Sequence, residues 1–119
     1  MKLGKLMIFV SDLTEARRFY GETLGFRLKH EDDRSLHFAH EGCDLGAFKC
    51  KRNATVQNYS DEARSVFVFE VPSIDIALQH LRDKGVEFLH AEPAENDFSR
   101  YAAFTDPFGN VHEIYELKN

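Results

Sequence analysis

The order of apolar and polar positions in the first half of the chain predicts one strand, one helix and three more strands. Residues 6–10 form an apolar run rich in β-branched side chains, which is typical of a buried strand. Asp12 then provides N-cap chemistry, apolar residues recur at helical spacing from Leu13, and Gly25 is suited to the helix C-cap. The strands that follow are expected at residues 26–31, 35–40 and 43–50.

The same order begins again after a polar stretch at residues 51–64, which is expected to link two halves. An apolar run at residues 65–71 predicts a strand. Ser73 is the expected N-cap of a helix over residues 74–84, and Gly85 ends that helix. The remaining strands are expected at residues 86–90, 100–105 and 110–116, with a polar loop over residues 91–99.

The two halves match at an offset of about 61 residues, which places Val10 on Val71. A slip of one residue then brings the two helix-ending glycines together. This internal repeat predicts an α+β fold made of two βαβββ repeats. We therefore expect a single domain over residues 1–119, with the repeats at about 2–50 and 65–117.

Each predicted repeat has one helix for four strands, so one face of each sheet is left uncovered by its own helix. Such bare faces must meet each other, meet a partner chain or enclose a ligand. We expect two curled mixed sheets around a cavity, and we expect two copies of the chain to pair as a homodimer.

A β-hairpin is predicted close to the end of the chain. Asp106 precedes a proline and can accept hydrogen bonds from the turn backbone, and Gly109 can take the positive φ that a bulged loop needs. In the second strand of the hairpin Glu113 lies on one face, and His112 and Ile114 lie on the other. Two interpretations stay open: Glu113 lines a cavity, or it faces water while His112 and Ile114 lie under a helix.

Composition and charge limit the class of protein. A chain of 119 residues with 43% hydrophobic residues is large enough for one domain with a real core. The net charge of −5 argues against nucleic acid or an anionic membrane as partner. We find no apolar segment of membrane-spanning length and no signal-peptide pattern, which favours a cytoplasmic protein. Cys43 and Cys50 would lie roughly 23 Å apart along one strand, too far for a disulfide, so reduced thiols are expected.

Several short motifs resemble the vicinal-oxygen-chelate superfamily, which includes glyoxalase I, extradiol dioxygenases, and the bleomycin- and fosfomycin-resistance proteins. The motifs are VSDL at 10–13, FY at 19–20, LGF at 24–26, and DPFGN at 106–110 followed by Glu113. The resemblance covers nearly the whole chain and implies the glyoxalase/bleomycin-resistance type of fold. It does not select one activity, because the same scaffold carries isomerisation, ring cleavage, thiol addition and drug sequestration.

The resemblance also implies four positions for metal ligands. In this chain they hold Lys5, Gly46 or Ala47, Val66 and Glu113. Glu113 is the one matching ligand, and a single carboxylate does not hold a transition metal, which needs about three or four donors. We therefore expect no metal or other cofactor. The ammonium of Lys5 would either pair with Glu113 or extend into solvent.

A slip of one or two residues in the fourth strand would instead bring Asp44 within reach of a metal. The hypothesis we favour is a metal-free binding module for a small organic ligand, in the manner of the bleomycin-resistance proteins. The alternative is a metal-dependent lyase like glyoxalase I (lactoylglutathione lyase), or a dioxygenase, in which a divalent metal acts and Glu113 moves a proton. An interaction domain with no ligand is a third possibility. The expected ligand-binding residues are Lys5, Met7, Phe9, Val66, Val68, Tyr101, Ala103, Glu113 and Tyr115.

Overall fold

The structure is a computed structural model that describes residues 1–53 and 65–119. The chain separates into two compact units, Met1–Ala54 and Thr55–Asn119, which we call the first and the second unit. Most of the predicted linker, residues 54–64, lies outside the described residues.

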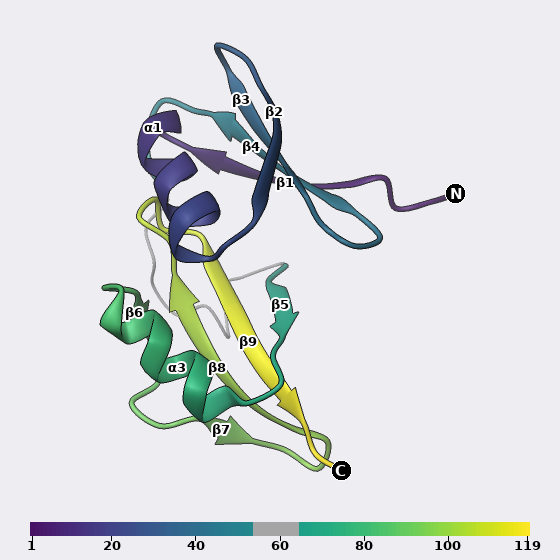
Figure 1. Ribbon diagram of the computed structural model, residues 1–119, viewed down its shortest axis with the longest axis vertical. Helices are drawn as coiled ribbons and strands as arrows, with labels where there is room; N and C mark the ends of the chain where they lie inside the picture. The colour runs from purple at the N-terminus through teal and green to yellow at the C-terminus, as the bar shows by residue number, and fades with distance from the viewer. Residues whose placement is uncertain (54–64) are drawn as a thin grey trace. The chain divides into compact units, whose positions relative to one another are not determined.

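The first unit contains one sheet and one helical segment (Figure 1). The order of strands in its sheet is β1-β4-β3-β2, with β1 parallel to β4 and the other pairs antiparallel. The helical segment joins β1 to β2 and contacts β4 and β2. The elements are β1 (Lys5–Val10), α1 (Leu13–Ala16), η1 (Arg17–Thr23), β2 (Arg27–Glu31), β3 (Ser35–Ala39) and β4 (Asp44–Lys49).

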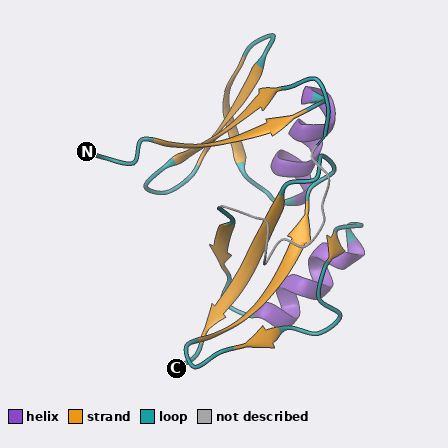
Figure 2. Ribbon diagram, turned by 180° about the vertical axis from the view of Figure 1, so that it is seen from behind, coloured by secondary structure: helices purple, strands orange, loops and turns teal. Residues whose placement is uncertain are grey.

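The second unit repeats this topology. Its strand order is β5-β9-β8-β6, with β5 parallel to β9, and the short β7 pairs with β8 outside that order. The helix α3 lies along β8 and β9 (Figures 1 and 2). The elements are β5 (Phe67–Glu70), α3 (Ile74–Asp83), β6 (Glu87–Phe88), β7 (Ala94–Glu95), β8 (Ser99–Thr105) and β9 (Val111–Leu117). The predicted α+β fold with two mixed sheets is confirmed, and neither sheet closes on itself.

Matching caps bound the helical segments of the two units. Asp12 has φ −141° and ψ 114°, and Ser73 has φ −141° and ψ 115°; each side chain accepts a hydrogen bond from the backbone N–H three residues on. Gly25 and Gly85 follow the helices with φ of +83° and +87°. A side chain strains the backbone in this left-handed region, so glycine is favoured at both places.

The helices themselves differ from each other, which the sequence pattern did not predict. The first helix was expected to be regular, but it changes after Ala16 into a π-helix, in which the N–H of Leu24 bonds to the carbonyl of Phe19 at 2.9 Å. The wider turn buries two adjacent rings, Phe19 and Tyr20, at 8% and 0% exposure. α3 is regular over ten residues. Among the described residues no helix is both long and apolar enough to cross a membrane.

Three predicted strand boundaries are corrected. The strand expected at residues 65–71 is limited to Phe67–Glu70, so Val66 lies just before it. The strand expected at residues 86–90 keeps only Glu87–Phe88, and the expected polar loop at residues 91–99 contains the short strand β7. Both short strands pair with β8, so their length depends on how far their backbone runs beside that strand.

The sheet face under α3 carries the core of the second unit. His112 stacks on Phe67, with ring centroids 5.4 Å apart, and Ile114 and Phe104 are buried beside it. Burial lowers the pKa of His112 to about 4, partly offset by the charge of Asp106. His112 and Ile114 therefore occupy the helix side of β9. Glu113 lies on the opposite face.

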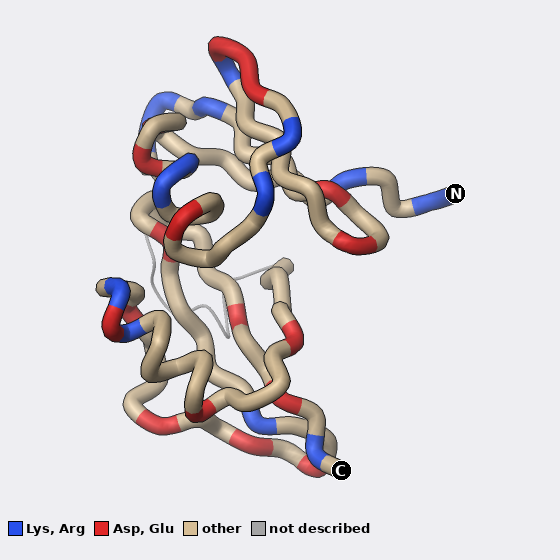
Figure 3. The backbone as a smooth tube through the Cα atoms, viewed as in Figure 1, with Lys and Arg blue, Asp and Glu red and all other residues tan. Residues whose placement is uncertain are grey.

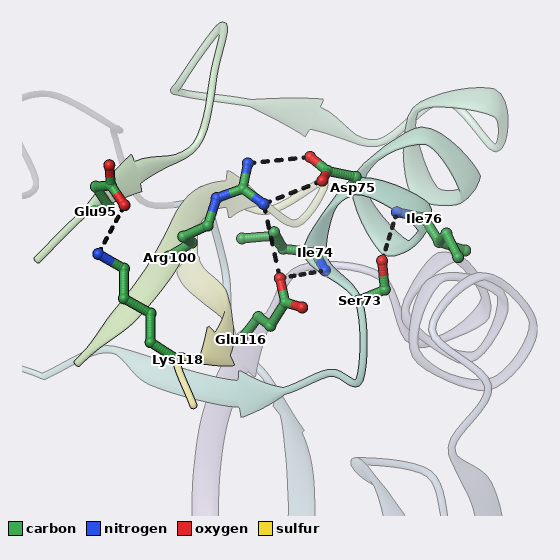
Figure 4. A network of polar contacts seen from close by, with 8 residues as sticks. All are labelled: Ser73, Ile74, Asp75, Ile76, Glu95, Arg100, Glu116 and Lys118. Atoms are coloured by element: carbon green, nitrogen blue, oxygen red, sulfur yellow. Dashed lines mark hydrogen bonds and ion pairs between the residues drawn. The ribbon is translucent and has the colours of Figure 1, made fainter. Parts of the chain in front are cut away.

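A polar network holds the start of α3 against β8 and β9 (Figure 4). The guanidinium of Arg100 makes two hydrogen bonds to the carboxylate of Asp75, at 3.0 and 3.1 Å. Glu116 lies 3.7 Å from Arg100 and accepts a hydrogen bond of 3.3 Å from the backbone N–H of Ile74. Acidic groups are favourable at a helix N-terminus, so this network fixes the position of α3 on its sheet.

The predicted hairpin turn lies between β8 and β9. Oδ1 of Asp106 accepts hydrogen bonds from the backbone N–H groups of Phe108 and Asn110 at 2.9 and 2.8 Å. Gly109 has φ +89°. The turn chemistry expected for Asp106 and Gly109 is confirmed, and it fixes the register in which β9 presents Glu113.

Candidate functional site

We call the sheet face of the first unit that its own helical segment does not cover the first face. It is formed by side chains of β1, β3 and β4 that alternate with the buried core positions. The register places Lys5 beside Asp44, Met7 beside Gly46, and Phe9 beside Phe48. Met7 and Phe9 are 50% and 53% exposed, so an apolar surface faces outward here. The members used below are Lys5, Met7, Phe9, Ser35, His37, Asp44, Gly46 and Phe48.

The ring of Phe48 lies over Gly46. A Cβ atom at Gly46 would come within 2.8 Å of Cε2 of Phe48 and 3.5 Å of Cδ of Lys5. The ammonium of Lys5 lies 5.6 Å from the centroid of the Phe48 ring, a cation–π distance. Ala47 points to the helix side and is fully buried. The fourth-strand position that the resemblance assigns to a metal ligand is thus covered by an aromatic ring and a cation.

Asp44 is engaged by a lysine from β2. Its Oδ2 accepts a hydrogen bond of 2.6 Å from Nζ of Lys29. This bond is the main reason that the pKa of Asp44 lies below its usual value, and the charges of Lys29 and Lys5 lower it further. Asp44, the residue expected to rebuild a metal site after a register slip, therefore lies beside two ammonium groups.

A chain of hydrogen bonds that the sequence did not suggest leads to His37. The carboxylate of Asp32 accepts the hydroxyl proton of Ser35 at 3.0 Å, so Oγ of Ser35 accepts from Nε2–H of His37 at 3.0 Å. Burial, followed by the charge of Lys5, lowers the pKa of His37. The ring packs edge-on against Phe48, with centroids 5.5 Å apart.

This chain is not a nucleophilic triad, because the hydroxyl lies between the carboxylate and the imidazole instead of beside the imidazole's other nitrogen. His30 pairs with His37 across β2 and β3, and their ring centroids are 5.6 Å apart. A tight turn at Asp32 sets this pairing. Counting outward from that turn would have placed His30 opposite His37 from the sequence alone.

The uncovered sheet face of the second unit, the second face, holds four of the expected binding residues. Val68 and Glu113 are paired across β5 and β9, and Tyr101 and Tyr115 across β8 and β9. Val68 is 49% exposed, and the other three are half-buried. The hydroxyl of Tyr115 donates to Glu70 at 3.1 Å, and this bond raises the pKa of Tyr115.

Two expected residues are placed differently from the others. Ala103 pairs with Glu113 on the second face but is fully buried, and its backbone N–H donates to Nδ1 of His90 at 2.9 Å. Val66 is half-buried and precedes β5. Lys5, Met7 and Phe9 come together on the first face. The two alternatives for Lys5, pairing with Glu113 or extending into solvent, both stay predictions.

The described residues can be checked for side chains that could bind a metal ion. Within residues 1–53 and 65–119, no group of three or more His, Cys, Asp or Glu side chains is arranged to hold a metal ion. At the positions where the resemblance implies ligands, Lys5, Gly46 and Val66 supply no carboxylate, imidazole or thiolate. The residues at these positions do not fit a transition metal.

The sequence model of the Glyoxalase/Bleomycin resistance protein/Dioxygenase superfamily matches residues 2–114, so the chain belongs to this superfamily. It is 24% identical over 120 residues to the uncharacterized protein YetH of Bacillus subtilis (strain 168), covering 97% of this chain and 98% of that protein. A glyoxalase family protein from Enterococcus faecalis matches with a TM-score of 0.79 and 24% identity over 97% of both chains. TnmS3, an antibiotic binding protein from Streptomyces sp. CB03234, matches with a TM-score of 0.72 and 22% identity over 99% of this chain and 97% of that one. The structural matches show the fold.

Proposed function

We propose that this protein binds a small organic molecule on its open sheet faces and holds no metal where its superfamily can hold one. The observation that carries the proposal is the covering of Gly46 by the Phe48 ring, with the ammonium of Lys5 5.6 Å from that ring. A metal cation at this place would be repelled by the positive charge of the ammonium. It would also find no ligating side chain at Gly46.

The apolar surface of both faces supports an organic ligand. Met7, Phe9 and Val68 are each about half exposed, with a few polar groups beside them. Small-molecule sites have this character, apolar with a small number of polar contacts that fix orientation. The fold is also used by TnmS3 to bind an antibiotic, which shows that this scaffold accommodates such a role in another protein.

We extend the proposal to assembly and location. Each sheet has one face that its own helix does not cover, and in this superfamily short chains commonly pair so that such faces enclose cavities. A homodimer is therefore expected by light scattering at tens of micromolar, a rough working concentration for an assembly governed by mass action. A monomer at that concentration would count against it. Cys43 and Cys50 are free thiols, which suits a reducing compartment such as the cytoplasm.

Two measurements test the proposed function. Elemental analysis of protein purified without a His-tag should find no stoichiometric Zn, Ni, Mn or Fe. Thermal shift against a library of small organic molecules should find stabilising ligands, and Lys5→Ala or Glu113→Ala should reduce their effect. Lys2→Ala is the control, because Lys2 is exposed and precedes the first strand.

Stoichiometric metal that is lost on Glu113→Ala would contradict the proposal. It would favour the metal-dependent lyase or dioxygenase instead, with Glu113 as a ligand and proton carrier. A library in which no compound raises the unfolding temperature would contradict the binding role.

A further inference from the structure

We propose that the first face takes an organic anion with an apolar body, such as an aromatic carboxylate, and that Lys5 pairs with its negative group. This inference rests on the proposed binding function and names the chemical class of the ligand. Its physical basis is a lysine that makes no ion pair with the described residues of its own unit, set beside exposed apolar side chains.

The positive charge comes from Lys5. Within residues 1–53 of the first unit, Lys5 forms no ion pair, and its ammonium lies over the Phe48 ring. Asp44, which lies beside Lys5 across β1 and β4, is hydrogen-bonded to Lys29 at 2.6 Å. Asp44 is therefore paired with Lys29, and the ammonium of Lys5 adds a further positive charge next to that pair.

The apolar part of the site lies next to that charge. Met7 and Phe9 follow Lys5 on the same face of β1, at 50% and 53% exposure. An inorganic anion would satisfy the ammonium and leave this surface in water. A neutral apolar molecule would cover the surface and leave the charge without a partner. A molecule with an apolar body and an anionic group satisfies both.

The difference in net charge between the two units favours binding of an anion to the first unit. Residues 1–53 contain ten Lys and Arg against eight Asp and Glu, whereas residues 65–119 contain four against ten. Figure 3 shows the same contrast, with more red than blue along the second unit. The chain as a whole carries −5, so attraction of an anion depends on the local charge around Lys5.

His37 contacts the Phe48 ring at this site. Its Nε2–H is held by Ser35, whose hydroxyl is held by Asp32, at 3.0 Å in both bonds. The ring so fixed packs edge-on against Phe48 and limits where that ring can move. The ring of Phe48 in turn holds the ammonium of Lys5 above the sheet.

Three probes with one apolar body and different charge test the inference: 2-naphthoate, neutral 2-naphthamide and cationic 2-naphthylmethylammonium. Binding is measured by isothermal titration calorimetry on the full chain. We expect 2-naphthoate to bind most tightly and to weaken as salt is raised, because salt screens exposed charges. Lys5→Met should weaken 2-naphthoate by about tenfold and leave 2-naphthamide unchanged, since only the charge pair is lost.

Two further variants sharpen the test. Lys2→Met removes a lysine outside the sheet and should leave all three affinities unchanged. Asp44→Asn removes a negative charge next to Lys5, and should tighten 2-naphthoate while weakening the cationic probe. Unchanged binding of 2-naphthamide to Lys5→Met shows that the face is still folded.

The inference is overturned if 2-naphthoate binds no better than 2-naphthamide, or if its advantage survives Lys5→Met. If 2-naphthamide or neutral library compounds bind and 2-naphthoate does not, the proposed function stands and the anion is wrong. If no probe and no library compound binds, both are wrong.

Discussion

Strands β4 and β9 occupy the same place in their two sheets, yet they carry different chemistry at equivalent positions. β4 pairs in parallel with β1, the first strand of its unit, and β9 pairs in parallel with β5, the first strand of its own unit. On the helix side, Leu45 of β4 corresponds to His112 of β9. On the open side, Gly46 corresponds to Glu113. One backbone pattern thus supports an apolar core with a covered glycine in one unit, and a buried imidazole with an open carboxylate in the other.

The comparison teaches that the repeat fixes the backbone and leaves the side chains free to diverge. The caps at Asp12 and Ser73 have nearly the same φ and ψ, and Gly25 and Gly85 have nearly the same φ. A side chain that faces the core or the open side needs only to pack well against the side chains around it. His112 is accommodated because the aromatic rings of the second unit surround it.

The largest expected effect is a pH dependence of the free energy of unfolding. His112 causes it, and Leu45, at the equivalent position of the first unit, does not titrate. The pKa of His112 is about 4 in the fold and about 6.5 when unfolded, so the unfolded chain binds the extra proton between these values. The stability that this difference contributes is present above about pH 6.5 and is lost as pH falls toward 4, by about 3 kcal/mol. Urea unfolding at pH 7.5 and pH 4.5 measures the loss.

His112→Leu gives the second unit the residue of the first and should remove most of this pH dependence. His80→Leu, at an exposed position on α3, is the matched control and should keep it. An unchanged pH dependence in His112→Leu would show that other groups cause the loss of stability.

The next effect concerns the open side, where Gly46 and Glu113 differ. Gly46→Ala places a methyl group where the Phe48 ring lies, so the ring must move and Lys5 loses its cation–π contact. We expect a net loss of about 1 kcal/mol, since the gain from removing a strand glycine is smaller than the lost packing. Urea unfolding measures the loss, and NMR contacts between Lys5 and Phe48 should weaken. Glu113→Ala should leave those contacts unchanged. A variant more stable than the natural chain would show that the ring moves at no cost.

The smallest effect is the difference between the two helix caps. Asp12→Ala and Ser73→Ala should each lower the free energy of unfolding by about 1 kcal/mol, the usual loss for a helix N-cap. The Asp12 bond is 3.0 Å and the Ser73 bond is 3.4 Å, so the Asp12 variant should lose more. Urea unfolding of both variants, with Thr14→Ala as a control on an exposed helix position, measures the difference. Equal losses would show that bond length does not set cap strength here.

Local chemistry explains how much of the fold followed from the sequence. Caps, helix-ending glycines and the Asp106 turn depend on residues close together in the chain, so their pattern predicted the two βαβββ repeats. The π-helix at Arg17–Thr23 did not follow, because it depends on burying both Phe19 and Tyr20 against the sheet. The lengths of β6 and β7 depend on contact with β8, which the local pattern does not contain.

For the candidate site, the sequence by itself determined which residue types stand at the superfamily's ligand positions, and so predicted a face with Lys5 and no metal ligand at Gly46. Only the tertiary structure decided that Phe48 covers Gly46, and that Asp32, Ser35 and His37 form one hydrogen-bonded chain. It also decided that Glu113 lies opposite the helix. The physical reason is that strand pairing and helix packing choose which face of a strand is buried, whereas alternation along the strand shows only which residues share a face.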